Sequence, residues 1–224
     1  MNDLVNQLSR AKFFGKFPEA DRRLLAELAI PKTIRAGEYV CHQGDVWANV
    51  IFVTKGDLQW AILSVSGREQ VLFTLHPHDV FWGHSIFDNG PMPASLKATK
   101  KTTLFRWQRE TILPILYRHP ETLWEITGML THTMRKARDI IYGLAFQPVA
   151  GRLANLLLDQ FSSPSSTSVE RDLTLGAIAS RVASSPEVVC RILHQFQAEG
   201  VLEVTRATIT LHDRSALENM LEPQ

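Results

Sequence analysis

Residues 173–200 restrict the fold more than any other stretch, because their pattern is that of two short helices joined by a tight turn. Ser184 and Ser185 interrupt the first apolar run, and both are favourable helix N-caps. Pro186 follows at a first-turn position, where its missing N–H costs nothing. The helical spacing of apolar residues then resumes and ends at Gly200, the expected C-terminal stop. The pattern predicts a helix-turn-helix, whose second helix enters the major groove of DNA.

Glu187 and Arg191 occupy the polar side of the second predicted helix. They are four residues apart, so they lie on one face in its first turns. Arginine can bind guanine through two hydrogen bonds, and glutamate can accept one from the N4 amine of cytosine. The same spacing suits an ordinary surface salt bridge, but the caps, the turn and the stop favour a DNA-reading pair.

The charge of the C-terminal region argues in the other direction. The whole chain carries a net charge of +1. From residue 148 onward it holds six arginines, no lysine and nine acidic residues, a balance of −3. Phosphate attraction supplies much of the non-specific affinity for DNA. We therefore expect DNA binding to require a dimer with its few arginines gathered on one face.

The remaining composition narrows the class of protein. With 224 residues the chain is long enough for two domains. No apolar stretch is long enough for a membrane span and the N-terminus does not resemble a signal peptide, so we expect a cytoplasmic protein with no membrane partner. Cys41 and Cys190 lie far apart, which argues against a disulfide framework and an iron–sulfur cluster. We do not expect an enzyme, because the sequence has no phosphate-binding loop, nucleophile elbow or convincing pair of metal ligands.

Short apolar runs separated by glycines fill residues 34–107. Leu58, Trp60 and Ile62 alternate with other residues as in a strand with one buried face. Ser66-Gly67, between two such runs, is typical of a hairpin turn. The spacing predicts an antiparallel barrel or sandwich.

A long helix is predicted after Pro120, because apolar residues recur at alternating intervals of three and four. This spacing is the heptad seam of a coiled coil, so we favour pairing of the helix with a second copy. The alternative is that the helix packs on its own β-domain. The helix breaks at residues 146–148, which we interpret as a hinge. The predicted dimer interface consists of Leu123, Ile126, Leu130, Thr133, Ala137, Ile140 and Leu144.

The C-terminal pattern continues with a helix over residues 149–161, a flexible loop over 162–168, two short strands around Arg206 and a last helix over 215–221. The two strands are the expected wing of a winged helix-turn-helix. The predicted fold class is α+β in three parts. These are an effector-sensing antiparallel β-roll domain over 1–118, a dimerisation helix and hinge over 119–147, and a winged helix-turn-helix domain over 148–224.

In this order the segments resemble the CRP/FNR family of bacterial transcription regulators, whose β-roll is of the cyclic-nucleotide-binding type. The resemblance covers nearly the whole chain. It rests on Ala36-Gly37-Glu38, Gln43-Gly44-Asp45, Phe52-Val53-Thr54-Lys55-Gly56, Ser66-Gly67-Arg68-Glu69, Val149-Ala150-Gly151-Arg152-Leu153-Ala154 and Ser184-Ser185-Pro186-Glu187-Val188-Val189-Cys190-Arg191.

The resemblance implies a homodimer that binds palindromic double-stranded DNA, with RNA polymerase as a further partner if the protein is an activator. In the family, the Glu and Arg of the E-x-x-x-R motif read a G·C pair in each half of the operator, and these roles pass to Glu187 and Arg191. Pro186 stands where the cyclic-AMP-responsive branch often has another base-reading Arg. The expected DNA-binding set is Ser184, Ser185, Glu187, Cys190, Arg191 and Arg206.

The effector site departs from the family pattern. Members that bind cyclic nucleotides carry Phe-Gly-Glu, followed about ten residues later by an Arg that pairs with the cyclic phosphate. This chain has Trp82-Gly83-His84, and no Arg lies between Arg68 and Arg106. A buried phosphodiester anion without its partner is costly, which argues against cyclic AMP. The expected pocket residues are Trp82, His84 and Ser95.

Two other signals are candidates. Asp79 to Ser85 is similar to the local sequence around the axial His of haem-based sensors in this family, which makes His84 a candidate haem ligand. A lone His in a loop is more often solvated or hydrogen-bonded, so we expect no metal site. Cys190 lies beside Arg191, whose charge favours a reactive thiolate, so oxidation could weaken DNA binding. The alternative, which we favour, is a small residue that fits the interface.

The predicted function is that of a homodimeric, sequence-specific DNA-binding transcription regulator that responds to an effector or redox signal other than cyclic AMP. The alternative is an effector-sensing protein whose winged helix mediates protein contacts and not DNA binding. The sequence does not specify the signal, the direction of regulation or the regulated genes.

Overall fold

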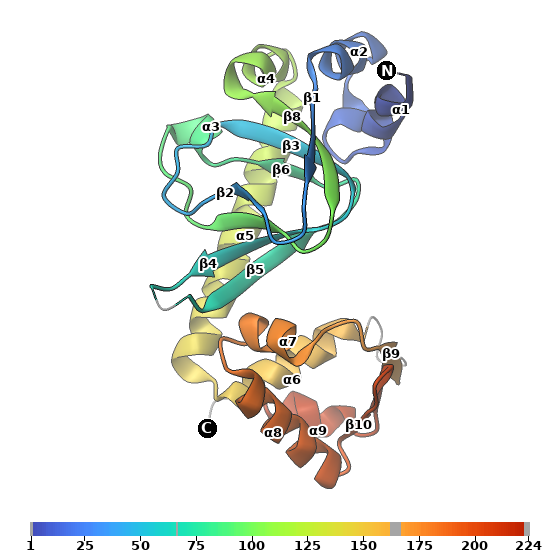
Figure 1. Ribbon diagram of the computed structural model, residues 1–224, viewed down its shortest axis with the longest axis vertical. Helices are drawn as coiled ribbons and strands as arrows, with labels where there is room; N and C mark the ends of the chain where they lie inside the picture. The colour runs from blue at the N-terminus through green and yellow to red at the C-terminus, as the bar shows by residue number, and fades with distance from the viewer. Residues whose placement is uncertain (1, 66, 162–166, 222–224) are drawn as a thin grey trace. The chain divides into compact units, whose positions relative to one another are not determined.

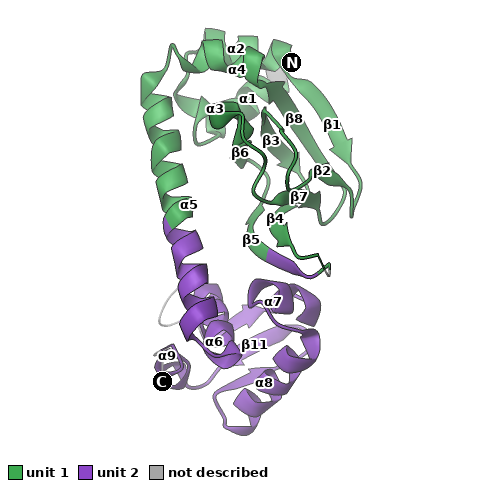
Figure 2. Ribbon diagram, turned by 90° about the vertical axis from the view of Figure 1, so that its left-hand side faces the viewer, with its two compact units in different colours: residues 1–67, 71–134 green, residues 68–70, 135–224 purple. Residues whose placement is uncertain are grey.

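The computed structural model describes residues 2–65, 67–161 and 167–221. The chain divides into two compact units (Figure 2). The N-terminal unit comprises residues 1–67 and 71–134, and the C-terminal unit comprises residues 68–70 and 135–224. The division falls within the long helix α5, Pro120–Phe146, which the sequence pattern predicts as a segment of its own.

The N-terminal unit consists of antiparallel sheets flanked by helices (Figure 1). One sheet has the strand order β1-β8-β3-β6, and the other has the order β2-β7-β4-β5. The strands are β1 Ile30–Ile34, β2 Tyr39–Cys41, β3 Asn49–Lys55, β4 Leu58–Leu63, β5 Glu69–Leu75, β6 Val80–Trp82, β7 Ser95–Ala98 and β8 Thr102–Gln108. The helices are α1 Asn2–Arg10, the short 3-10 helix η1 Phe14–Lys16, α2 Glu19–Leu28, α3 Ser85–Asp88 and α4 Arg109–Leu116.

Strand β3 shows how this unit builds two cores. Val50 and Phe52 belong to a core shared with the helices, whereas Ile51 and Val53 belong to a core shared with the second sheet. Because side chains alternate across a strand, a strand covered on both faces is apolar throughout. This explains the continuous apolar run that the sequence shows here. The predicted hairpin turn includes Ser66, which lies outside the described residues.

The C-terminal unit packs its helices against a small sheet with the strand order β10-β11-β9. Its helices are α6 Val149–Gln160, α7 Leu175–Arg181, α8 Pro186–Ala198 and α9 Arg214–Asn219. Its strands are β9 Ser168–Glu170, β10 Leu202–Val204 and β11 Thr208–Leu211. Most of the predicted loop over 162–168 lies outside the described residues. The predicted α+β fold, with an N-terminal β-domain, a long helix and a C-terminal helix-turn-helix, is confirmed.

Helix α5 packs its first turns against the core of the N-terminal unit. Ile126 is 1% exposed, and Leu123 and Leu130 pack against the same cluster. Ile126, predicted to face a second copy, therefore belongs to the core of its own unit. In this part of the seam the helix packs on its own domain, which was the alternative to pairing. Farther along, Ala137 and Leu144 are exposed and Ile140 is half-buried.

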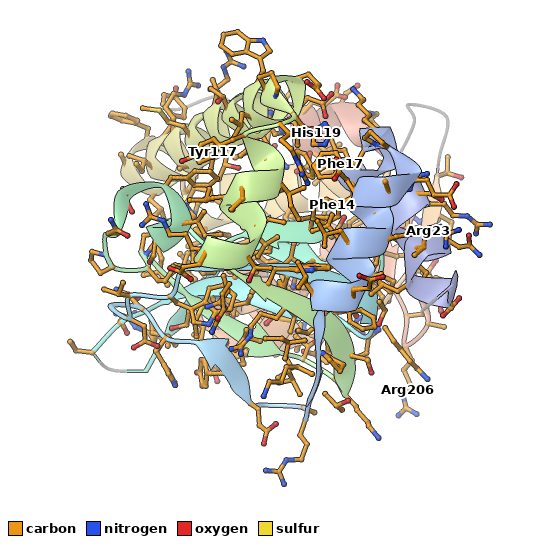
Figure 3. The ribbon with its side chains drawn as sticks, turned by 90° about the horizontal axis from the view of Figure 1, so that it is seen from above. Phe14, Phe17, Arg23, Tyr117, His119 and Arg206 are labelled. Atoms are coloured by element: carbon orange, nitrogen blue, oxygen red, sulfur yellow. The ribbon has the colours of Figure 1, made fainter. Side chains whose placement is uncertain are left out.

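His119, immediately before α5, joins this helix to the N-terminal helices (Figure 3). Its ring stacks on Phe17 with the centroids 4.2 Å apart, and its Nε2 lies 2.7 Å from Asp21 Oδ2 in α2. Lys16 of η1 also pairs with Glu125 of α5. Polar contacts therefore fix the first turns of α5 on the N-terminal unit, in addition to apolar packing. Within the described part of the chain, no helix is both long enough and apolar enough to span a membrane.

Candidate nucleic-acid interface and effector site

The turn between α7 and α8 is held by backbone and capping hydrogen bonds. Ala183 has a φ of 50°, a left-handed conformation that ends α7 and reverses the chain. The Ser184 amide donates to the carbonyl of Ala179 over 3.0 Å. The Ser185 hydroxyl accepts from the Val188 amide over 3.4 Å and caps α8 as the sequence predicts. Ser184 and Ser185 thus shape the turn and are half-buried.

Glu187 and Arg191 are exposed together on α8, opposite its buried side. A hydrogen bond from the Ser185 side chain holds the pKa of the Glu187 carboxyl below its usual range. The carboxylate is therefore ionised at neutral pH and able to accept hydrogen bonds. His194 is exposed one turn farther along, and the Cys190 Sγ, half-buried beside it, lies 4.0 Å from His194 Nε2. The four side chains give the start of α8 both donors and acceptors.

Arg152 of α6 supports the turn from within the unit. Its Nε donates to the Val182 carbonyl over 2.9 Å, and its Nη1 donates to the Gln147 carbonyl over 2.7 Å. Burial lowers the pKa of Arg152 from its ordinary value. One guanidinium thus connects the turn of the helix-turn-helix to the corner between α5 and α6. In the sequence, Arg152 is visible only as part of the motif over residues 149–154, which does not indicate this role.

Replacing Arg152 with Met should lower the free energy of unfolding of the C-terminal unit by about 2–3 kcal/mol, because buried carbonyls lose charge-assisted donors. Amide hydrogen exchange in α7 and α8 measures this change. Arg206→Met, which removes an exposed arginine of the same unit, should leave the exchange nearly unchanged. Equal protection of α7 and α8 in the Arg152 variant and the wild type would show that the contacts do not support the turn.

Arg206 lies at the exposed tip of the wing formed by β10 and β11, and Figure 3 shows its side chain projecting from the ribbon. The Thr205 hydroxyl accepts from the amides of Ala207 and Thr208 over 3.2 and 2.9 Å, which tightens the turn. Arg171, after β9, donates from Nη1 to the Thr205 carbonyl over 2.9 Å. Strand β9 and the contact of Arg171 were not predicted, because the only local signal in the sequence is a three-residue run beside a serine-rich loop.

The three predicted effector residues do not gather at one site. Trp82 is 1% exposed and belongs to the core beneath the N-terminal helices, where its ring meets Phe13 edge-on. His84 lies on the other side, with its ring parallel to Trp60 at 5.7 Å. Ser95 is 2% exposed and its hydroxyl accepts from the Gln43 amide over 2.9 Å. Trp82 must therefore be removed from the expected pocket, because it shares a face of β6 with Val80 in the core under the helices, whereas Phe81 between them faces the core between the sheets.

The donor set between the sheets does not fit a cyclic nucleotide. Met92 and Ala94, which precede Ser95, are 1% and 0% exposed and pack in the apolar core between the sheets. No arginine is available in this segment to pair with a phosphate. A cyclic phosphodiester would be buried among apolar groups without a counter-charge.

A haem group would need His84 as its axial ligand. Within the described residues, the buried Nδ1 of His84 has no hydrogen-bond partner. A ligating His almost always donates its second nitrogen to a carboxylate, carbonyl or water, which fixes the ring for the metal. Apart from haem, whose iron needs only one or two protein ligands, the described residues contain no group of three or more His, Cys, Asp or Glu side chains that could hold a metal ion.

Burial lowers the pKa of His84 below its ordinary value of 6.5, and the carboxylate of Asp88 offsets part of this effect. As the pH falls through that ordinary value, the unfolded chain takes up a proton that the folded chain resists, so stability declines. We expect urea unfolding of the N-terminal unit, followed by tryptophan fluorescence, to become easier from pH 7 to pH 5. His84→Phe keeps an aromatic ring without a titratable nitrogen, so it should reduce the dependence of stability on pH. An unchanged dependence on pH would contradict the role of His84.

Comparison with known proteins covers both units. Residues 31–119 match the family model of the cyclic nucleotide-binding domain, and residues 151–220 match that of the Crp-like helix-turn-helix domain. The cyclic AMP receptor protein of Thermus thermophilus is 27% identical over 185 residues, which are 82% of this chain and 84% of that protein.

Solved structures show the same fold. A CooA variant from Carboxydothermus hydrogenoformans has a TM-score of 0.76 at 20% identity, covering 88% of this chain and 90% of that one. The c-di-GMP responsive regulator CLP of Xanthomonas campestris has a TM-score of 0.74 at 18% identity, covering 87% of this chain and 99% of that one.

Proposed function

Because the chain belongs to the CRP/FNR family of transcription regulators, we propose that it acts as a homodimer that reads a palindromic DNA site and responds to a signal other than cyclic AMP. Regulators of this family bind DNA as dimers. The observation that carries the proposal is the exposed start of α8, where Glu187 and Arg191 share one face above a capped turn. A recognition helix uses this part of its surface to contact base edges.

The dimer face proposed here is the exposed heptad of α5, defined as Trp124, Thr127, Thr131, Met134, Arg138, Ile141 and Ala145. Each of its residues directly follows, in the sequence, one residue of the seam predicted above. Trp124, Met134 and Ile141 are 79%, 77% and 65% exposed in the single chain. The hydroxyls of Thr127 and Thr131 donate to carbonyls of their own helix over 2.9 Å, so both residues can be buried without losing a partner.

The proposed signal is not cyclic AMP, because the segment that leads to Ser95 places Met92 and Ala94 in an apolar core and supplies no arginine. The fold itself does not require cyclic AMP, since the similar regulator CLP is described as c-di-GMP responsive. The chemical identity of the signal is open to ligand screening against the N-terminal unit.

Selection of binding sites from random double-stranded DNA tests the proposal. We expect an enriched palindrome with a G·C pair in each half, the two halves about one helical turn apart. Failure to enrich any palindrome, with cell extract present to supply the signal and in both redox states, would contradict it.

The acidic balance of the C-terminal region supports a second candidate, in which the winged helix binds a protein partner. This candidate predicts that no DNA sequence is enriched and that a protein partner binds through a basic surface complementary to the acidic one.

Cys190 offers a redox route to regulation. We infer that peroxide converts its thiolate to a sulfenate, with release of water, and that the added bulk beside Arg191 weakens operator binding. Cys190→Ser should bind the operator in the reduced state and keep its affinity after peroxide treatment. Equal loss of affinity in both proteins would leave Cys190 as a small residue that fits the interface.

A further inference from the structure

Arg138 is the charged residue of the exposed heptad, whose other members are apolar or hydroxyl-bearing. In a parallel two-stranded coiled coil, equivalent seam residues of the two helices lie close to each other across the axis. Two Arg138 side chains therefore approach each other when two copies of α5 pair. A single polar or charged seam residue fixes the register of the helices and lowers the stability of the dimer.

The residues that flank the exposed heptad provide no counter-charge. Those next to the seam are Gly128, Leu130, Arg135, Ala137, Tyr142 and Leu144, and none carries a carboxylate. Glu125, elsewhere on the helix, pairs with Lys16 of its own chain. Arg135 adds a further positive charge less than one turn before Arg138.

Arg138 has one acidic neighbour, which lies outside the seam. Its Nη2 is 2.8 Å from Asp139 Oδ1, and the two side chains are 77% and 63% exposed. An ion pair this exposed contributes little and is screened by solvent. When the helices pair, the guanidinium must either keep Asp139 at the edge of the seam or exchange it for a partner within the seam.

We propose that a multivalent oxyanion, of the phosphate or diphosphate type, binds between the two Arg138 guanidiniums and that dimer formation depends on it. A guanidinium presents two parallel donors to an oxyanion, and one anion with several oxygens can serve two of them. The inference rests on the homodimer proposed above. Pairing of two helices through the exposed heptad then requires a bound anion in addition to apolar contacts.

Sedimentation equilibrium of the full chain tests this, in chloride buffer and in buffer with inorganic diphosphate at equal ionic strength. The dissociation constant of the wild-type dimer should fall by about tenfold or more with diphosphate, as two charge-assisted contacts form. Arg138→Gln should form a tight dimer in both buffers. Lys136→Gln removes the same charge from a position outside the seam and should respond like the wild type.

A wild-type dimer that is equally tight in both buffers would overturn the inference, as would an Arg138→Gln protein that still responds to diphosphate. If Lys136→Gln also fails to respond to diphosphate, the response depends on the total positive charge of the helix and not on Arg138. That result also overturns the inference. Normal dimers and operator binding without any anion response leave the proposed function intact. Monomers in every variant and buffer, with no operator binding, would contradict the proposed function itself.

Discussion

Ile126→Ala should lower the free energy of unfolding of the N-terminal unit by about 3 kcal/mol, whereas Ile141→Ala should leave it nearly unchanged. Ile126 is 1% exposed within its own unit, so its truncation leaves a cavity. Ile141 is 65% exposed in the single chain, so its truncation removes contacts only from a paired state. Urea unfolding, at protein concentrations below the dissociation constant of the dimer, measures the difference.

Intrinsic tryptophan fluorescence can report the unfolding in this comparison. Tryptophan fluorescence follows only the N-terminal unit, because its residues include all five tryptophans, Trp47, Trp60, Trp82, Trp107 and Trp124. Sedimentation equilibrium should give the reverse order, with weaker dimers for Ile141→Ala than for Ile126→Ala. A stable Ile126→Ala protein that fails to dimerise would restore the seam predicted from the sequence.

Arg191→Ala should bind the selected operator about 10- to 100-fold more weakly and lose about 1–3 kcal/mol of discrimination at the G·C pair of each half-site. The exposed guanidinium on α8 is the group expected to bind guanine. Fluorescence anisotropy with the operator and with a duplex substituted at this pair measures both effects.

Arg206→Ala is the matched control, because it removes the same side chain from the tip of the wing. It should weaken binding to every duplex alike and reduce the salt dependence by about one phosphate contact. If Arg191→Ala instead weakens both duplexes equally and keeps the wild-type discrimination, Arg191 contacts phosphate and does not read a base.

The helix-turn-helix could be predicted in detail because local signals determine it. Ser185 caps α8 by a hydrogen bond within four residues, and Gly200 ends the region with a φ of 71°. The order of the β-domain, the long helix and the wing could be predicted for the same reason. Each depends on periodicity or turn residues over short stretches.

Two features could not be obtained from the sequence, because they depend on which face of an element is covered. Two apolar stripes run side by side on α5, and only the packed structure shows that the stripe with Ile126 faces its own unit. Trp82 and His84 are two residues apart, yet one lies in the core under the helices and the other stacks on Trp60. Long-range supports such as Arg152 leave no periodic pattern in the sequence.

Titration of the full chain against the selected palindrome tests the central claim most directly, with a second duplex in which the G·C pair of one half-site is exchanged. We expect two chains per palindrome and an affinity about 5- to 200-fold lower for the exchanged duplex, as for one mismatched base pair. Equal affinity for both duplexes, or binding of a single chain, would contradict a homodimer that reads DNA through Glu187 and Arg191.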